Sequence, residues 1–145
     1  MAERHKLIAA VYLFLAQDGK VLLSRRYNTG YHDGEYSLVA GHIEKGESAT
    51  AAMVREAEEE AGIAIKPESL KLAHFIHRKG EDGDERMNFF FTTDRWDGEP
   101  HIVEPEKCDE LRWFPIADLP ENVIPYIRTA IENWHKGVLY SEYGW

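Results

Sequence analysis

The chain has 145 residues, of which 43% are hydrophobic and 30% are charged, as in a globular protein with one core over residues 1–145. Its formal net charge of −9 argues against a nucleic-acid polymer as partner, which would need a basic stripe, but allows a small phosphorylated ligand held through a cation. The single cysteine, Cys108, excludes an internal disulfide and is typical of a protein in the reducing cytoplasm. No apolar run is long enough for a membrane span, so we expect a cytoplasmic protein without a membrane partner.

The N-terminal part of the chain predicts a hairpin of two strands. Residues 7–15 (LIAAVYLFL) form an almost wholly apolar run, which is typical of a strand buried on both faces. The dipeptide Asp18-Gly19 favours a tight hairpin turn. The chain is then expected to return as a second strand over residues 21–26.

A loop, a short strand and a helix are expected next. Residues 28–35 are rich in Gly, Asn and Asp, as loops are, and residues 36–40 read as a short strand. Residues 49–61 contain no Pro or Gly and include five Ala, the strongest helix former. Ser48 is a suitable N-cap and Gly62 a suitable left-handed C-terminal residue, so the helix is predicted over residues 49–61.

The second half of the chain predicts more strands and one more helix. Residues 70–78, 87–93 and 110–114 are apolar or alternating runs, and a polar hairpin tip at 79–86 separates the first two. Apolar residues recur at helical spacing between about 123 and 136. Strands on both sides of a helix, joined by hairpins and crossovers, predict an α/β fold in which a mixed sheet lies between helices.

The glutamates of the first predicted helix project from two different faces of the helix. At ~100° per residue, Glu56, Glu59 and Glu60 project together beside the apolar face, whereas Glu58 projects to its other edge. Like charges this close destabilise a helix, and a hard cation such as Mg²⁺, which prefers oxygen ligands, would relieve the repulsion. The alternative is a solvated acidic face.

Residues 41–63 (GHIEKGESATAAMVREAEEEAGI) fit the pattern G-x5-E-x7-R-E-U-x-E-E-x-G-U, where U is aliphatic. The matching positions are Gly41, Glu47, Arg55, Glu56, Ala57, Glu59, Glu60, Gly62 and Ile63. These fixed offsets favour a functional site over a solvated face. The segment resembles the signature of the Nudix hydrolases, which cleave nucleoside diphosphates linked to another moiety. The resemblance implies the Nudix fold, an α/β/α sandwich with a central mixed sheet, in a small MutT-like member.

The resemblance also implies roles for individual residues. Glu59 and Glu60 match the main metal-binding glutamates, and Glu56 matches a position that is a metal ligand or a general base. Glu47 and Arg55 match positions that support the catalytic loop. The carbonyl of Ala40 and the carboxylate of Glu104 are further candidate ligands. The expected cofactor is Mg²⁺, with Mn²⁺ as a substitute. Catalytic roles are assigned to Glu56, Glu59, Arg55 and Glu47.

The candidate substrate-binding residues lie outside the motif. Arg25 and Arg26 should point to opposite faces of their strand, and Arg26 matches a phosphate-contacting arginine of MutT-like members. Tyr36 is a candidate for stacking on a base. Acidic residues of the tip at 79–86 are further candidate acids. The aromatic tail at 139–145 is expected to cover the core, form a dimer contact or border the pocket, and both a monomer and a homodimer stay open.

The predicted activity is Mg²⁺-dependent cleavage of the pyrophosphate linkage of a nucleoside di- or triphosphate derivative, with a (deoxy)nucleoside triphosphate as the first candidate. The alternatives are a pyrophosphatase acting on ADP-ribose or another nucleoside-diphosphate sugar, and a nucleotide-binding Nudix sensor without activity. A third possibility, isomerisation of an isoprenyl diphosphate, needs a catalytic Cys and extra His ligands, which Cys108 and its surroundings do not supply.

Overall fold

The computed structural model describes residues 2–145. Two helices, α1 (Ala49–Ala61) and α2 (Pro125–His135), and a short 3₁₀ segment, η1 (Pro67–Ser69), accompany the sheet. The strands are β1 (Ile8–Gln17), β2 (Lys20–Arg26), β3 (Tyr36–Ser37), β4 (Val39–His42), β5 (Lys71–Lys79), β6 (Glu85–Thr93), β7 (Cys108–Pro115) and β8 (Tyr140–Tyr143).

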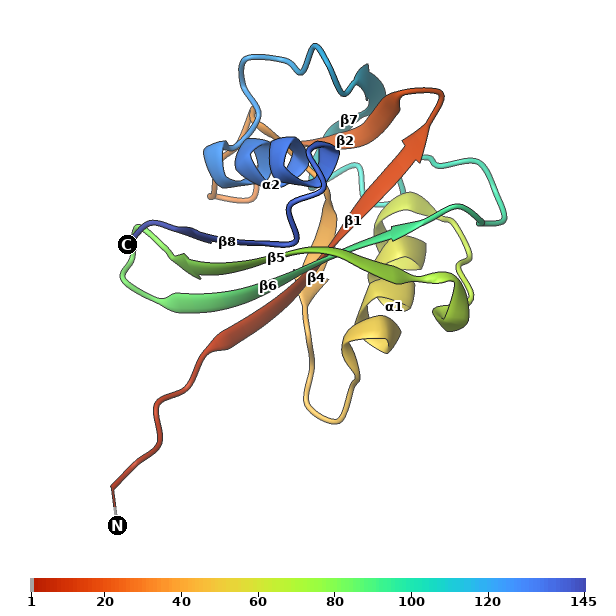
Figure 1. The fold of residues 1–145 in the computed structure, drawn as a ribbon. Coiled ribbons are helices and arrows are strands. Elements are labelled where there is room, and N and C mark those ends of the chain that lie inside the picture. Colours follow the sequence, from red (N-terminus) through yellow and green to blue (C-terminus); the bar gives the residue numbers. More distant parts are fainter. Residues whose placement is uncertain (1) are drawn as a thin grey trace.

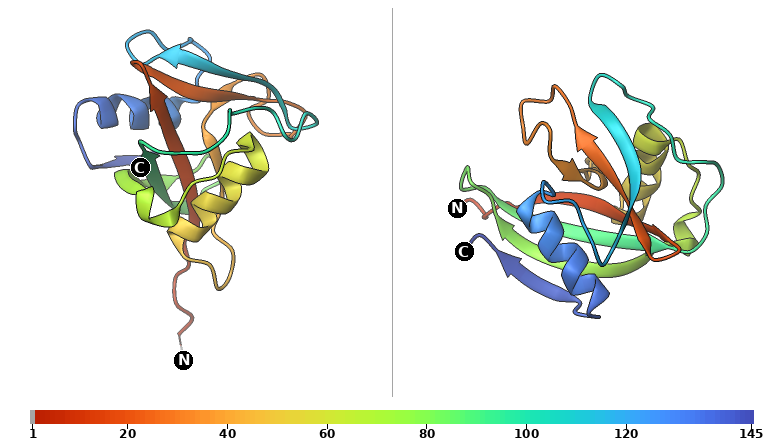
Figure 2. Two further views of the ribbon diagram at one scale, coloured as in Figure 1. Left: turned by 90° about the vertical axis from the view of Figure 1, so that its right-hand side faces the viewer. Right: turned by 90° about the horizontal axis from the view of Figure 1, so that it is seen from above.

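The sheet is mixed, as predicted, and β1 is the strand that joins its parts. The strand order is β3-β2-β1-β6-β5-β8, with β4 paired to β1 and β7 paired to β2. The β1–β6 and β5–β8 pairs are parallel, and the other pairs are antiparallel. Helices α1 and α2 lie on opposite faces of the sheet (Figure 1), and the view from above shows α2 lying across β5 and β8 (Figure 2).

The core consists of two layers separated by β1. Successive side chains of a strand point to opposite faces. Ala10, Tyr12 and Phe14 therefore pack towards α2, and Val11, Leu13 and Leu15 pack towards α1. All six are buried, so the predicted burial of this strand on both faces is confirmed.

Helix α1 has the predicted bounds because both of its ends are capped as the sequence indicates. The Ser48 hydroxyl accepts a hydrogen bond from the amide of Ala51 at 3.2 Å. Gly62 has a φ of 67°, a left-handed conformation that costs glycine little. Met53 and Ala57 are fully buried against the sheet, so the apolar face expected from the spacing does face the core.

Several elements differ from the sequence-based expectation. The single strand expected over residues 36–40 is two strands, because β3 pairs with β2 whereas β4 pairs with β1. Helix α2 begins at Pro125 rather than near 123, since a proline is favourable in the first helical turn. The hairpin strands β5 and β6 extend further than expected and leave residues 80–84 as the turn.

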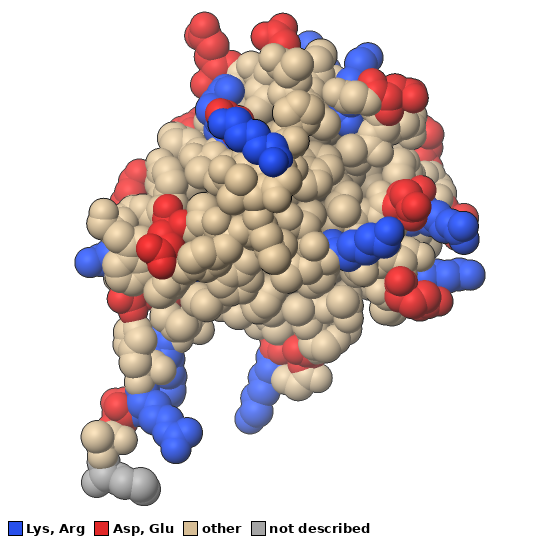
Figure 3. Space-filling view, viewed as in Figure 1, with Lys and Arg blue, Asp and Glu red and all other residues tan. Residues whose placement is uncertain are grey.

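The C-terminal tail forms strand β8, which the sequence alone did not reveal. It pairs in parallel with β5, and the Trp145 indole N–H donates a hydrogen bond to the carbonyl oxygen of His77 at 2.9 Å. The tail thus covers the outer edge of the sheet. Charged side chains lie mainly around the margin of the face shown in Figure 3, whose centre is uncharged. No helix within residues 2–145 is long and apolar enough to cross a membrane.

Candidate active site

Strand β4 and helix α1 approach each other most closely at Gly41 and Glu56. A Cβ atom placed on Gly41 would lie 2.1 Å from the carboxyl carbon of Glu56. No real side chain tolerates such a distance, so any larger residue at position 41 would displace this carboxylate. The motif glycine is therefore explained by the space that Glu56 occupies, not by its backbone conformation.

Arg55 connects the glutamates of the motif. Its Nε donates to one carboxylate oxygen of Glu47 at 2.7 Å and its Nη2 donates to the other at 2.9 Å, which is a bidentate ion pair. Its Nη1 donates to Glu56 at 2.7 Å and to Glu59 at 3.2 Å. The hydrogen bonds from Arg55 are the main reason that the pKa of Glu47 falls to about 2. Arg55 thus fixes the loop before α1 to the carboxylates on the helix.

Glu60 is held from strand β4 rather than by Arg55. Its carboxylate accepts a hydrogen bond from the amide of Ala40 at 2.8 Å. Burial is the largest cause that raises the pKa of Glu60 to about 8, and the charges of Glu56 and Glu104 raise it further. Burial likewise raises the pKa of Glu56, against the opposing effect of Arg55. These two carboxylates therefore lie in an environment that penalises their charge and favours a cation beside them.

Glu104 reaches the same region from the segment before β7. It is far from α1 in the sequence, yet its charge raises the pKa of both Glu56 and Glu60. Lys107 lies 3.5 Å from the Glu104 carboxylate. The structure thus brings the predicted auxiliary carboxylate close to the carboxylates of the motif.

A cavity of about 440 Å³ opens beside these residues. Glu60 and Glu104 line it together with the cations Arg26 and Lys107. Arg26 donates to the Tyr31 carbonyl oxygen at 2.6 Å and to the Thr29 hydroxyl at 3.0 Å, so its position depends on the loop after β2. Two carboxylates and two cations in one cavity suit a phosphate ligand bound together with a metal ion.

Arg25 and Tyr36 lie apart from this cavity. Arg25 forms ion pairs with Asp109 at 2.8 Å and Glu110 at 3.2 Å, so the two neighbouring arginines do point to different surroundings. Tyr36 is only 6% exposed, and its ring packs edge-on against Phe114 with 4.9 Å between centroids. Tyr36 is therefore a core residue of β3, and neither cavity near the motif includes it.

The residues around the first cavity fit a hard divalent cation in their chemistry. The donors are carboxylate oxygens, which Mg²⁺ and Mn²⁺ prefer, and the raised pKa values mark negative charge that the protein leaves poorly compensated. Within residues 2–145 no three His, Cys, Asp or Glu side chains converge closely enough to hold a metal ion. Arg55 bridges Glu56 and Glu59 in this arrangement, so metal binding would require these carboxylates to turn.

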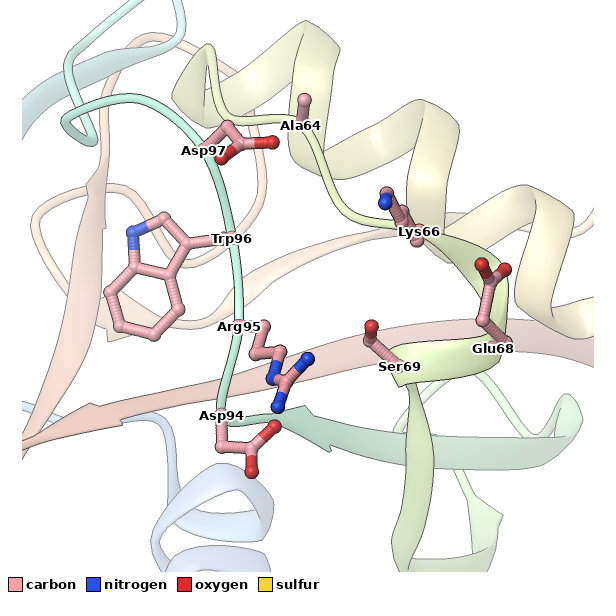
Figure 4. Close-up of a pocket in the computed structure, with 8 residues that line it drawn as sticks. All are labelled: Ala64, Lys66, Glu68, Ser69, Asp94, Arg95, Trp96 and Asp97. Atoms are coloured by element: carbon pink, nitrogen blue, oxygen red, sulfur yellow. The ribbon is translucent and has the colours of Figure 1, made fainter.

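A larger cavity of about 610 Å³ lies away from the motif glutamates. Lys66, Glu68 and Ser69 approach it from the segment after α1, and Asp94 and Arg95 approach it from the segment after β6 (Figure 4). Its charges are mixed and it contains none of the motif residues. Its size alone gives no reason to place the chemistry there.

Sequence reasoning missed several polar residues close to the motif. Lys107 follows Glu104 by three positions, and nothing in its local pattern marks it. Arg78 and Arg86 are opposite each other in the β5–β6 pair and line a second cavity next to Gly41. The signal for Arg78 was its register, since it follows His74 and Ile76 at inward-facing positions of a strand with period two.

Two solved structures with a similar fold are NUDIX hydrolases. The MutT NUDIX hydrolase from Burkholderia pseudomallei superimposes with a TM-score of 0.80 at 27% identity, over 88% of this chain and 98% of that one. A NUDIX hydrolase from Nitrosomonas europaea gives a TM-score of 0.78 at 26% identity, over 93% of both chains. The mixed sheet between two helices is thus the α/β/α sandwich of the Nudix fold.

The sequence comparison agrees with the fold. The family model described as NUDIX domain matches residues 4–134, so the chain belongs to the NUDIX family. The family and the hydrolase neighbours together indicate a pyrophosphohydrolase.

Among curated proteins, the NAD-capped RNA hydrolase NudC of Stutzerimonas stutzeri is 29% identical over 115 residues. The same-named protein of Escherichia coli O1:K1 / APEC is 24% identical over 115 residues. Both matches cover 79% of this chain but only 39% and 42% of those proteins, so the chain spans less than half the length of these relatives.

Proposed function

We propose that this chain hydrolyses the pyrophosphate linkage of a small nucleoside di- or triphosphate derivative, with Mg²⁺ as cofactor and Mn²⁺ as a substitute. The observation that carries the proposal is the joint lining of one cavity by Glu60, Glu104, Arg26 and Lys107, beside the Arg55-linked glutamates of α1. Carboxylates that hold a cation and basic groups that contact phosphate are the two components that phosphoryl transfer requires.

The carboxylates and the strand β4 would form the metal site. Glu56, Glu59, Glu60 and Glu104 would supply the side-chain oxygens, and the carbonyl of Ala40 would supply a backbone oxygen. A bound divalent ion neutralises charge on the phosphoryl oxygens and makes water a better nucleophile. Because metal ligands must be deprotonated, ion binding would lower the raised pKa of Glu60.

The chain's own residues would position the reacting groups and move the proton. Glu56 is the first candidate to accept a proton from water, because burial raises its pKa and so favours proton uptake. Glu59, whose side chain is 54% exposed, is the second candidate. Arg55 and Glu47 are positioning residues, since they hold the glutamates and the loop without lining the cavity. Arg26 would contact a phosphate of the substrate.

The first substrate class to test is the (deoxy)nucleoside triphosphates, followed by ADP-ribose and other nucleoside-diphosphate sugars. The curated relatives are named for NAD-capped RNA, and NAD also contains a pyrophosphate joining two nucleosides. A nucleotide sensor without activity is disfavoured, because all the glutamates of the motif are present, with Glu47, Glu56 and Glu59 linked through Arg55 and Glu60 held by the amide of Ala40.

The decisive experiment combines a substrate panel with matched variants of one helix. The purified chain is incubated with Mg²⁺ and deoxynucleoside triphosphates, ADP-ribose, nucleotide sugars or NAD⁺, and the products are identified by chromatography. We expect Glu60→Gln to lower turnover at least ~100-fold, since even residues beyond the direct ligands can change metal affinity ~10–100-fold.

Glu58→Gln is the matched control, because Glu58 is exposed on the same helix and belongs to no ion pair within the described chain. It should keep full activity. Tight nucleotide binding without product from any panel member would reject the hydrolase, and equal turnover in both variants would reject the proposed metal site.

A further inference from the structure

A second cavity, of about 370 Å³, adjoins the first on the α2 side of strand β4. Both cavities are lined by Arg26, Ser37 and Ala40, so one ligand can occupy both. We call the second cavity the arginine pocket, because its lining includes Arg26, Arg78 and Arg86, together with Tyr12, Tyr126 and Asp82. None of the roles proposed above uses Arg78 or Arg86.

Arg78 is an unusual residue for the interior of a sheet. It is only 6% exposed, and its guanidinium carbon lies 3.8 Å from the centroid of the Tyr126 ring. Its Nε has no hydrogen-bond partner, and none of the ion pairs found within residues 2–145 includes it. A buried arginine is normally paired with a carboxylate, because burying an uncompensated charge is costly.

Other unsatisfied polar atoms lie on the same face of the sheet. Arg78 is opposite Arg86, and Ile76 is opposite Asn88, in the β5–β6 register. The Nε of Arg86 and both polar side-chain atoms of Asn88 are buried without partners. Because side chains alternate along a strand, Arg78, Arg86 and Asn88 face the same way, towards Tyr12 and α2. Such a concentration of unpaired polar atoms beside a cavity indicates a missing ligand.

The charge of the pocket indicates the chemistry of that ligand. Three guanidinium groups line it, and the one carboxylate among its lining residues, Asp82, is bound to Arg86 at 2.9 Å. This local excess of positive charge contrasts with the formal net charge of −9 for the whole chain. The unpaired atoms on this face are the Nε donors of the cations Arg78 and Arg86 and the amide nitrogen and oxygen of Asn88. Three of these four atoms are donors, which the oxygens of an anion can satisfy.

We propose that the arginine pocket binds an oxyanion of the substrate, a phosphate or a carboxylate outside the cleaved pyrophosphate, and that Arg78 determines the preference for it. The inference rests on the proposed hydrolase function and narrows its substrate class. The substrate would lie across β4, with its pyrophosphate at Glu60 and Arg26 and its additional oxyanion at Arg78 and Arg86.

Matched substrate pairs test this preference directly. NADP⁺ differs from NAD⁺ by one phosphate, and UDP-glucuronate differs from UDP-glucose by one carboxylate, so the two pairs distinguish the two sources of the oxyanion. In at least one pair we expect kcat/KM to favour the anionic member roughly tenfold or more, as for charge-assisted hydrogen bonds in a desolvated site.

Arg78→Met should bring that ratio close to one, and Arg78→Lys should leave an intermediate ratio because lysine keeps the charge but loses the planar fork. Arg95→Met is the control, since Arg95 is exposed at the separate cavity of Figure 4 and should leave the ratio unchanged.

A binding measurement separates this inference from the hydrolase proposal. Calorimetry in EDTA compares adenosine 2′,5′-bisphosphate with AMP, and UDP-glucuronate with UDP-glucose, on the wild type and on Arg78→Met. An affinity ratio that disappears in the variant supports the pocket even if nothing is cleaved. Ratios within twofold in every wild-type pair, by both assays, overturn it.

Thermal unfolding provides the test against a merely structural role. Arg78→Met should unfold at the same temperature as the wild type or higher, because the substitution removes a buried cation that has no carboxylate partner and methionine can still pack on the Tyr126 ring. A clearly lower unfolding temperature, together with an unchanged substrate ratio, would show that Arg78 serves the fold and would overturn the inference.

Discussion

The Glu56 carboxylate fills the space that a side chain at Gly41 would need, because a Cβ at position 41 would lie 2.1 Å from the Glu56 carboxyl carbon. Gly41→Ala should therefore move the carboxylate while leaving strand β4 intact. We expect the rate to fall roughly 100-fold, the scale on which a displacement of about 1 Å in an active site acts. Steady-state kinetics measures the rate, and circular dichroism should show an unfolding temperature within a few degrees of the wild type. Normal activity of the variant would mean that the position of Glu56 is not critical.

Arg55 is the single connection between Glu47, Glu56 and Glu59. Arg55→Lys keeps the charge but loses the bidentate contact, so we expect activity to fall ~10–100-fold, as for residues that orient metal ligands. Arg112→Lys is the matched control, since Arg112 also pairs with a glutamate but lies on the exposed part of β7.

The same variant should change the stability of the protein in acid. The pKa of Glu47 is lowered to about 2 in the folded chain from an ordinary value of 4.5. Its contribution to stability is therefore present above pH 4.5 and is lost as the pH falls towards 2. In Arg55→Lys the acid unfolding midpoint, followed by circular dichroism, should move to higher pH. An unchanged midpoint would show that the Glu47 ion pair does not stabilise the folded state.

The raised pKa of Glu60 predicts that, without metal, the stability of the folded chain depends on pH in the opposite direction. Its folded pKa is about 8, above the ordinary value of 4.5, so the folded state holds a proton that the unfolded state releases between these values. Stability should fall as the pH rises through this range, by an amount on the order of 2 kcal/mol after allowance for solvent screening.

Urea unfolding in EDTA at a series of pH values measures this dependence. Glu60→Gln should flatten the curve, whereas Glu58→Gln should reproduce the wild-type slope. Added Mg²⁺ should raise stability most at high pH, because the metal and the proton compete for Glu60. A wild-type curve that rises with pH over the same range would contradict the raised pKa.

The family and the fold could be predicted because the information is local and dense between residues 41 and 63. Capping residues and Ala content determine the ends of α1, and the motif spacing identified the Nudix family, which the family model and the fold both confirm.

The features that the sequence did not reveal depend on distant pairing. The division of residues 36–42 into β3 and β4 depends on two partner strands, and β8 exists because β5 offers an open edge. Tyr36 is aromatic and near the loop, but its burial against Phe114 is decided by β7. Arg78 is predicted only as the last residue of a strand, and its burial depends on the packing of β5 against β6 and α2.

Strand β4 connects the proposed metal site with the arginine pocket. Ala40 lines both cavities, Gly41 accommodates Glu56, and the backbone amide of Ala40 holds Glu60. The two cavities thus meet at this strand. Inserting one residue into β4 would shift its register against β1. The cavity at Glu60, where the pyrophosphate would be cleaved, would then no longer be aligned with the arginine pocket, which would select the substrate. Relatives that differ in the length of this strand should therefore differ in what they accept, even with every glutamate of the helix retained.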